Sequence, residues 1–584
     1  MKATRALLAA AAISAALILA GCTSTPAAQG PTVTVATADA LRSSNPQTVS
    51  GNTPANIDVA YLTNSSFVSY DSTPKLVHNS AFGTYRVLST RPLTVKYTVN
   101  SGVTWSDGTP VDAADMLLAW ASALSRYNST GVDFQSIDAG GALDLVDAVP
   151  KISDDGRSIT LVYSKRFVDW RTAFEIGVPA HTTYRIAYPG TSPSDAKAAV
   201  ISAIQHGKTA VLAKIATAWS TGYELRSMPS NTDLLVSDGA YTITAFTSAG
   251  VTLTANPKYS WGVKPSVSTI KLRFSEDPAA QERALASGSV DVVSGQASAQ
   301  SVAALKALPR VTVSASVEST FEHVDLTFDN HGPFDSASYG GSQQRALEVR
   351  QAFLKTIPRQ QILDAVVRPV DANASLDNSQ TFLPGAPGYS GSVSANGSAA
   401  YAEVDLPGAR ALLAAAGVTT PITVRIAYSK DTARLQQEFA LIAASAAQAG
   451  FTVVNDGSAG DRFITALGTG SYDASIFSWQ FSGTEATASE AQLKSSANKS
   501  IGNYNGYSNA ASDQDWEEIE VTPGRRDQIR LLRQIDANAW NDAYGVTLYQ
   551  LPDVTAVANR VQHVVDSPLS PNVFWNFWQW TASQ

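Results

Sequence analysis

The sequence predicts a mixed α/β fold, and three observations lead to this class. Segments of alternating polarity that are rich in β-branched and aromatic residues recur along the chain, as is typical of strands. Segments with helix-capping signals lie between them, and the order follows no repeat period. The composition, 44% hydrophobic and 16% charged over 584 residues, is that of a globular protein of more than one domain.

The N-terminal segment resembles a bacterial lipoprotein signal. Lys2 and Arg5 precede an apolar stretch over residues 6–20, which is shorter than the about 20 apolar residues that span a bilayer. Residues 19–22 (LAGC) resemble a lipobox, which implies removal of residues 1–21 and acylation of Cys22. A buried thiol is the alternative, but Cys22 has small polar neighbours and no core around it. We expect a mature protein held by lipid on the extracytoplasmic face of the cell membrane, at the cell surface or in the periplasm.

Residues 22–32 are small, polar and proline-containing, as in a flexible tether, so ordered structure is expected from residue 33. An Asp-Asp-Gly turn at residues 154–156 predicts a hairpin. Alternation or β-branched content predicts strands over residues 93–99, 159–163, 240–246, 251–255, 269–274, 323–328 and 422–428.

Helices are predicted from their start signals. Asp112 and Asp115 place a capping acceptor and a second carboxylate before an apolar run. Residues 277–278 and 522–523 each pair a capping side chain with a proline, which favours the first helical position. An amphipathic helix is expected over residues 431–450, where a glycine ends it.

Residues 105–115 (WSDGTPVDAAD) combine an aromatic residue, an Asp-Gly turn, a Thr-Pro stop and a capped helix. This segment resembles the signature of the family 5 extracellular solute-binding proteins, the peptide, oligopeptide and nickel receptors of ATP-binding-cassette (ABC) importers. Because Asp-Gly supplies the positive φ of a tight turn, Trp105 and Asp107 are expected to be structural. Further segments similar to the family follow in order along the chain, among them residues 179–181, 237–241, 256–259, 284–292, 349–353 and 548–550.

The resemblance implies a two-lobed periplasmic-binding-protein-like fold, of type II and the large peptide-binding cluster, with an extra subdomain inserted in lobe 1. We expect lobe 1 over residues 33–318 with the subdomain at about residues 76–229, lobe 2 over residues 319–548, and a return to lobe 1 at residues 549–584. The solute would be enclosed between the lobes. Hinged closure is then a population shift, driven by a ligand that touches both lobes.

The resemblance also implies residues of the ligand cleft. In the oligopeptide branch, a Trp after the Tyr-Asp strand lines the cleft, and an acid three positions later pairs with the peptide's α-ammonium. Trp479 matches the Trp, with core packing as the alternative, but Ser482 replaces the acid. Glu485 or another carboxylate then substitutes, or the ligand lacks a free amine. The candidate ligand-binding residues are Trp479, Phe481, Ser482 and Glu485, with Asn64 and Phe67 near the N-terminus and Asn505 and Tyr507 after the Trp479 loop, for which turn and core roles are the alternative.

These features predict a membrane-tethered receptor that captures peptides or oligopeptides and delivers them to the permease and ATPase subunits of an ABC importer. The alternative is the same fold binding an oligosaccharide or a metal chelate. A lipid-anchored hydrolase is disfavoured because the sequence has no G-x-S-x-G or H-E-x-x-H motif.

No catalytic residue, metal or cofactor is expected, since the six histidines lack ligand-like spacing. The net charge of −8 disfavours nucleic acid, whose binding depends on Lys and Arg. We expect a monomer.

Overall fold

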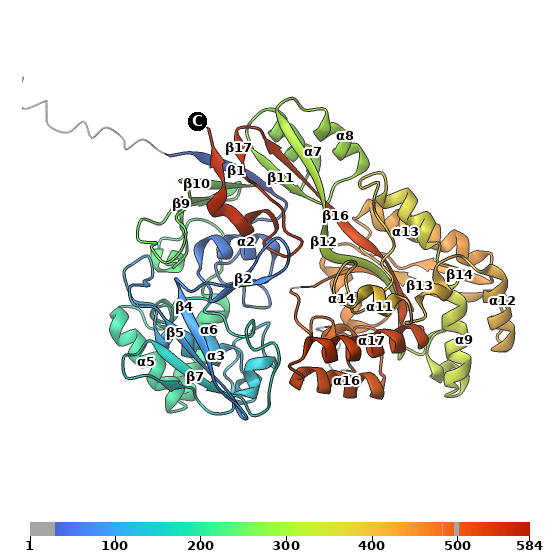
Figure 1. Cartoon of the computed structure of the whole chain (residues 1–584), viewed down its shortest axis with the longest axis horizontal. Coiled ribbons are helices and arrows are strands. Elements are labelled where there is room, and N and C mark those ends of the chain that lie inside the picture. Colours follow the sequence, from blue (N-terminus) through green and yellow to red (C-terminus); the bar gives the residue numbers. More distant parts are fainter. Residues whose placement is uncertain (1–29, 482, 496–501, 584) are drawn as a thin grey trace, which may run out of the picture.

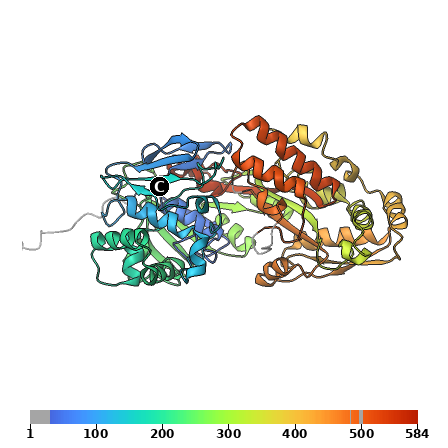
Figure 2. The same cartoon turned by 90° about the horizontal axis from the view of Figure 1, so that it is seen from below.

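A computed structural model describes residues 30–481, 483–495 and 502–583 of the chain. Cys22 therefore lies outside the described residues. The elements form two bodies, which Figures 1 and 2 show side by side from two directions. Two long strands, β12 (Val311–Leu326) and β16 (Gly545–Ala558), run from one body into the other. The predicted α/β class is confirmed.

One sheet of ten strands passes through both bodies. The first lobe supplies β1 (Thr32–Thr37), β8 (Tyr241–Thr247), β9 (Gly250–Ala255), β10 (Thr269–Phe274) and β11 (Val292–Gly295), and the second supplies β13 (Ile422–Ala427), β14 (Phe451–Asn455) and β15 (Ala474–Gln480). The order is β14-β13-β15-β12-β16-β11-β1-β10-β9-β8. The antiparallel pair β12 and β16 thus joins the two halves of the sheet, through β15 on one side and β11 on the other.

The pairing of β12 with β16 is interrupted at the passage between the lobes. The register breaks between Val317 and Phe321 and shifts again between Glu322 and His323. The first half of β12 is partly exposed, whereas residues 319–326 are all buried. A break in a two-strand connection leaves few hydrogen bonds to resist bending, so this stretch suits a hinge.

A four-stranded antiparallel sheet and a helical layer form a separate part of the first lobe (Figure 1). The sheet contains β4 (Gly83–Thr90), β5 (Leu93–Val99), β6 (Lys151–Ile152) and β7 (Ser158–Val162), and the helices are α3 (Ala113–Ser122), α4 (Ala180–Ala187), α5 (Pro193–Gln205) and α6 (Thr209–Thr221). A short hairpin of β2 (Val68–Tyr70) and β3 (Leu76–His78) precedes this sheet.

The other helices lie around the large sheet, either against it or against other helices. In the first lobe these are α2 (Pro54–Thr63), α7 (Pro278–Ala286), α8 (Ala299–Lys306) and the C-terminal 3₁₀ segment η7 (Asn572–Gln579). In the second lobe they are α9 (Gln343–Leu354), α10 (Arg359–Ile362), α11 (Tyr389–Val393), α12 (Leu406–Ala415), α13 (Ala433–Ala447), α14 (Asp461–Thr469), α15 (Glu490–Leu493), α16 (Ala510–Val521) and α17 (Arg525–Asn541).

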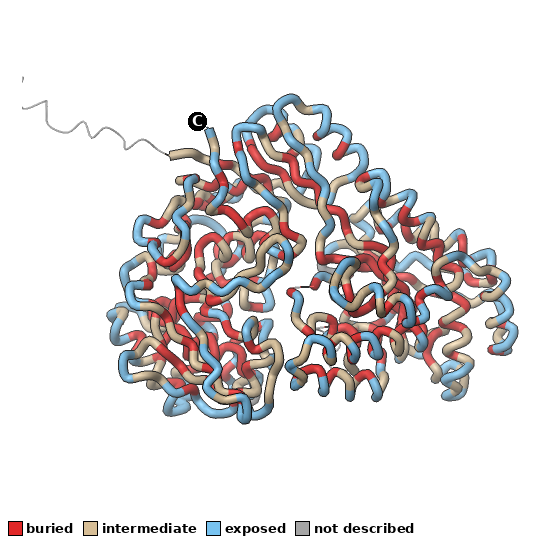
Figure 3. Tube along the Cα trace, in the orientation of Figure 1, coloured by how far each residue is buried: buried red, intermediate tan, exposed pale blue. Residues whose placement is uncertain are grey.

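Each lobe has its own hydrophobic core (Figure 3). The first cluster draws on residues 33–292 and 561–580, and the second on residues 324–551. The C-terminal residues therefore return to the first lobe, where η7 packs on α2 with the Tyr61 and Phe577 rings 6.1 Å apart.

The signature segment joins parts of the first lobe that are distant in sequence. Asp112 and Asp115 cap α3 reciprocally, and Asp115 also accepts hydrogen bonds from the Ala180 amide (2.8 Å) and from Lys197 Nζ (2.8 Å). Burial alone would raise the pKa of Asp107, but hydrogen bonds from His181 and from residue 109 outweigh it and lower this pKa to about 2. The signature therefore acts in folding, by fixing α3 against the segments that begin α4 and α5.

A candidate ligand cavity between the lobes

A cavity of about 1030 Å³ lies where the two lobes meet. Known small-molecule pockets measure about 300–1,000 Å³, so this one can accept a large solute. Most of the first-lobe wall comes from side chains within four segments: residues 57–81, which run from α2 to just after β3, the loop over residues 167–175, residues 259–263 and the C-terminal residues 570–578. Glu485, Thr487 and Ala488 of the second lobe complete it.

The second-lobe wall is hydrogen-bonded to the first lobe. The Tyr70 hydroxyl on β2 donates to Glu485 Oε1. Asp169 accepts from the Ala486 amide (3.3 Å), the Thr487 amide (3.2 Å) and the Thr487 hydroxyl (2.9 Å). We call these bonds the closure contact, since they connect the two lobes at the edge of the cavity.

A second group of polar contacts crosses between the lobes nearby. The Val168 amide donates to the Glu520 carbonyl (2.7 Å), and Lys165 forms an ion pair with the Glu520 carboxylate. Lys494 pairs with the same carboxylate at 2.9 Å. Burial would raise the pKa of Glu520, but the hydrogen bonds from the two lysines lower it below its usual range. Glu520 therefore stays ionised and keeps the loop of residue 168 against α16.

The charged groups of the cavity are acidic. Burial raises the pKa of Asp169, although its hydrogen bonds to residue 487 oppose the shift. Glu175 is open to the cavity but surrounded by protein; this enclosure, with a smaller effect of the Asp138 carboxylate, raises its pKa to about 7. Burial and the neighbouring Glu485 carboxylate raise the pKa of Tyr70 well above its usual value.

Of the residues predicted to bind ligand, Asn64 and Glu485 line the cavity. Asn64 ends α2, where its amide donates to the Ala60 carbonyl (2.7 Å). The backbone of residues 63–64 lies against Gly239, where a Cβ atom would stand 2.3 Å from the Thr63 carbonyl carbon. Glycine at position 239 thus allows the close approach that places Asn64 on the wall.

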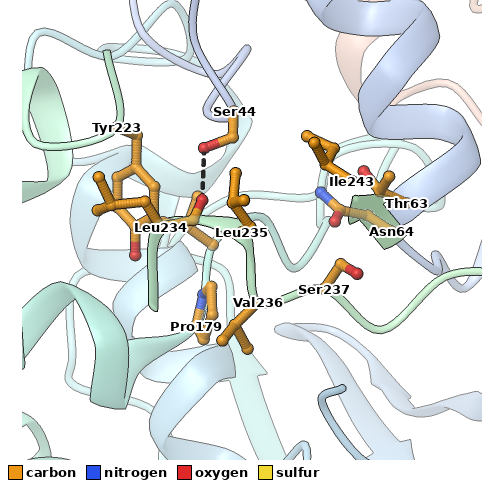
Figure 4. Close-up of a pocket in the computed structure, with 11 residues that line it drawn as sticks. Ser44, Thr63, Asn64, Pro179, Tyr223, Leu234, Leu235, Val236, Ser237 and Ile243 are labelled. Atoms are coloured by element: carbon orange, nitrogen blue, oxygen red, sulfur yellow. Dashed lines mark hydrogen bonds between the residues drawn. The ribbon is translucent and has the colours of Figure 1, made fainter. Parts of the chain in front are cut away.

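Asn64 also borders a much smaller pocket of about 20 Å³ inside the first lobe (Figure 4). Thr63, Ser237 and Ile243 lie around it, and the Ser44 hydroxyl donates to the Leu234 carbonyl (3.0 Å) at its side. This volume suffices for about one water molecule and not for a solute. The cavity between the lobes is the better candidate for ligand binding.

Four of the predicted residues are buried in the cores. Phe67 is 1% exposed and packs edge-on against Phe82 (5.1 Å between ring centroids), and Phe481 is 5% exposed and stacked on Phe321 (5.6 Å). Asn505 and Tyr507 are each 2% exposed, and the Tyr507 hydroxyl donates to Asp542 (2.8 Å). These four are absent from the cavity wall, and their positions favour structural roles.

Trp479 lies near the end of β15, half-buried, and packs on the cluster around Phe463 and Phe477. Its indole Nε1 is buried and has no hydrogen-bond partner among the described residues. It is not part of the cavity wall. Ser482 lies outside the described residues.

Other residues of the wall were not predicted. Tyr61 lies in the segment that contains Asn64, so its position could have been inferred from that segment. Asp169 and Glu175 come from an irregular loop that has no periodicity or motif. Tyr259 lies in the family-like segment of residues 256–259, which was not predicted to bind ligand, and Trp578 lies in a segment without a predicted role.

Within the described ranges, no helix is long and apolar enough to cross a membrane. The same residues contain no group of three or more His, Cys, Asp or Glu side chains arranged to hold a metal ion.

The model of the bacterial extracellular solute-binding proteins, family 5 (middle), matches residues 85–500. An uncharacterized lipoprotein of Mycobacterium tuberculosis is 25% identical over 582 residues, which cover 98% of this chain and 97% of the relative. The oligopeptide-binding protein OppA of Mycobacterium bovis is 23% identical over 497 residues, 83% of this chain and 74% of OppA.

Among solved structures, the periplasmic EDTA-binding protein EppA superposes with a TM-score of 0.79 at 20% identity, covering 95% of this chain and 97% of EppA. This likeness confirms the predicted two-lobed binding-protein fold. Members of the family bind peptides or other small solutes and work with ABC importers; they are receptors, generally not enzymes. The chain belongs to the family 5 bacterial extracellular solute-binding proteins.

Proposed function

We propose that this chain is a lipid-tethered receptor that captures peptides between its lobes and delivers them to the permease of an ABC importer. The observation that carries the proposal is the cavity of about 1030 Å³ whose wall includes Asn64 from one lobe and Glu485 from the other. A ligand that touches both walls stabilises the closed arrangement by its differential affinity for it. The likeness to OppA supports peptides as the solute.

The tether is proposed from the LAGC sequence at residues 19–22 and from the relatives that are called lipoproteins. Acylation of Cys22 would keep the receptor beside the membrane-embedded permease. For the domains we propose a first lobe over residues 33–318, with its subdomain at about residues 76–229, a second lobe over residues 319–548, and the return at residues 549–584. The register break after Val317 supports the first of these boundaries.

Glu485 is proposed as the acid that binds the peptide's α-ammonium group in place of Ser482. Its Oε1 atom accepts from Tyr70, whereas Oε2 is buried and has no partner among the described residues. A hydrogen bond between charged groups contributes about 1.5–3 kcal/mol, so an ammonium group here would add about tenfold or more to the affinity.

Titration calorimetry with matched free and N-acetylated peptides tests this function. A thermal-shift screen of di- to nonapeptides, Fe(III)-EDTA and oligosaccharides first selects the solute class. We expect peptides to bind, and N-acetylation to lower their affinity about tenfold or more. Glu485→Gln should remove most of this difference in affinity between free and acetylated peptides. Glu517→Gln, an exposed glutamate on α16 away from the cavity, is the matched control. Binding of the chelate or the oligosaccharide without any peptide would overturn the proposal.

A further inference from the structure

The charges on the cavity wall are of one sign. Its acidic side chains are Asp169, Glu175 and Glu485, and no Lys or Arg is found among its described residues. His78 is the one described side chain of the wall that can become cationic, and its Nε2 lies 3.0 Å from the Gly83 carbonyl. A solute enclosed here therefore meets carboxylates and no fixed positive charge.

Glu175 has no ion pair or hydrogen bond to any described residue. Its neighbours Phe174 and Ile176 are each 2% exposed and point into the first-lobe core, whereas the Glu175 side chain is exposed to the cavity. Phe174 packs on Tyr97 with ring centroids 4.6 Å apart, which fixes the backbone that presents Glu175. Because this carboxylate is exposed to the cavity and has no protein partner, it is free to pair with a cationic group of a ligand.

The other two carboxylates differ in whether they retain an unpaired hydrogen-bond acceptor. Asp169 already accepts three hydrogen bonds from residues 486 and 487, so it serves the closure contact. Glu485 retains a buried oxygen without a described partner. The wall therefore offers two separate acceptor positions for cations, Glu485 on the second lobe and Glu175 on the first.

The rest of the wall suits the stem of a cationic side chain. Tyr61, Phe167, Tyr259 and Trp578 contribute aromatic surface, on which alkyl chains pack and over which ammonium or guanidinium groups are attracted. Anionic solutes such as metal–EDTA complexes would be repelled by the carboxylates and would find no Lys or Arg on the described wall.

We propose that the cavity selects solutes with at least two positive charges, such as peptides with a free α-ammonium group and a Lys or Arg side chain, and rejects anionic ones. Glu485 binds one cation and Glu175 the other. This inference rests on the proposed function and narrows its substrate class.

The inference includes a pH dependence. A cation pairs with the ionised form of Glu175, whose pKa lies near 7 in the unliganded protein, so affinity for a dication rises from pH 5.5 to pH 8. Asp138 and Asp238 interact electrostatically with Glu175 from neighbouring segments. The titratable groups of the same wall are Tyr61, Tyr70, His78, Asp169, Tyr259 and Glu485.

Titration calorimetry on the purified full chain with tri-lysine, tri-alanine and tri-glutamate tests the inference at pH 7.5. We expect tri-lysine to bind at least tenfold more tightly than tri-alanine, and tri-glutamate most weakly. Glu175→Gln should lower the affinity for tri-lysine about tenfold and change the affinity for tri-alanine little. Glu517→Gln should leave both affinities unchanged. Equal affinity for tri-lysine and tri-glutamate, or an unchanged ratio in Glu175→Gln, would overturn the selectivity.

A non-peptide pair, the cation spermidine and the anion citrate, separates this inference from the proposed function. Binding of spermidine, but of neither citrate nor any peptide, would overturn the peptide proposal and support charge selection. Binding of tri-alanine with no preference for tri-lysine would support the peptide proposal and overturn charge selection. Failure of every probe, in a protein whose thermal unfolding shows that it is folded, would overturn both.

Discussion

At the scale of single residues, the first lobe depends on a few buried charges. Asp115 is 0% exposed and accepts hydrogen bonds from the amides of Asp112 and Ala180 and from Lys197, which is itself 6% exposed. Breaking one partner of a buried ion pair leaves the other charge uncompensated.

Asp115→Ala is therefore expected to destabilise the first lobe by about 3–5 kcal/mol. Because a two-lobed protein need not unfold in one step, the measurement is the shift of the first transition in a calorimetric scan. Asp154→Ala, at an exposed turn of the same subdomain, is the control and should change stability by less than about 0.5 kcal/mol. Similar shifts in the two variants would contradict this role for Asp115.

Residue-level predictions from the sequence succeeded where the chemistry is local. The capping role of Asp112 is confirmed, and so is that of Asp277, which accepts from the Ala279 amide. The capping of α17 by Thr522 is wrong: this helix begins after Gly524, and the Thr522 hydroxyl donates instead to the Glu518 carbonyl (2.7 Å) at the end of α16. Thr522 lies between two adjacent helices, and the sequence pattern alone does not show whether it belongs to the end of the first or the start of the second.

At the scale of elements, the loop over residues 164–176 is central, because it supplies both the closure contact and Glu175 on the cavity wall. Asp169 holds the 486–487 backbone from across the cleft. We expect these hydrogen bonds to break when the lobes open, so that they add to the stability of the closed, ligand-bound state.

Asp169→Ala is expected to weaken ligand affinity about tenfold, through a faster dissociation rate, because the closed state loses three hydrogen bonds. Surface plasmon resonance with the best peptide from the screen measures this rate. Asp154→Ala is again the control, since it lies in the same lobe but not on the cavity wall. An unchanged dissociation rate in Asp169→Ala would show that the closure contact does not retain the ligand.

The regular elements could be predicted, and the loops of the site could not. Strands expected over residues 93–99 and 269–274 coincide with β5 and β10, and the hairpin at residues 154–156 joins β6 to β7. Alternating polarity marks such strands because one face is buried. Asp169 is held by contacts with residues 486 and 487 of the other lobe, and Glu175 by the packing of Phe174 on Tyr97. Such contacts between distant segments leave no periodic signal in one sequence.

At the scale of the whole molecule, two strands connect two lobes that each have a large hydrophobic core, and the cavity lies between these lobes. Resemblance to the family, not the residue pattern alone, predicted this architecture. The residues predicted for the site lie in different places: Asn64 and Glu485 line the cavity, whereas Phe67, Phe481, Asn505 and Tyr507 are buried elsewhere. A conserved fold can hold different side chains against its ligand, so site residues must be placed one by one.

The central claim is that solute binds between the lobes, against Asn64 on one side and Glu485 on the other. A crystal structure of the chain with its best-binding peptide tests it most directly. The account predicts ligand density in the cavity, with the α-ammonium group within hydrogen-bond distance of Glu485. Ligand density at another place, with the cavity empty, would contradict it.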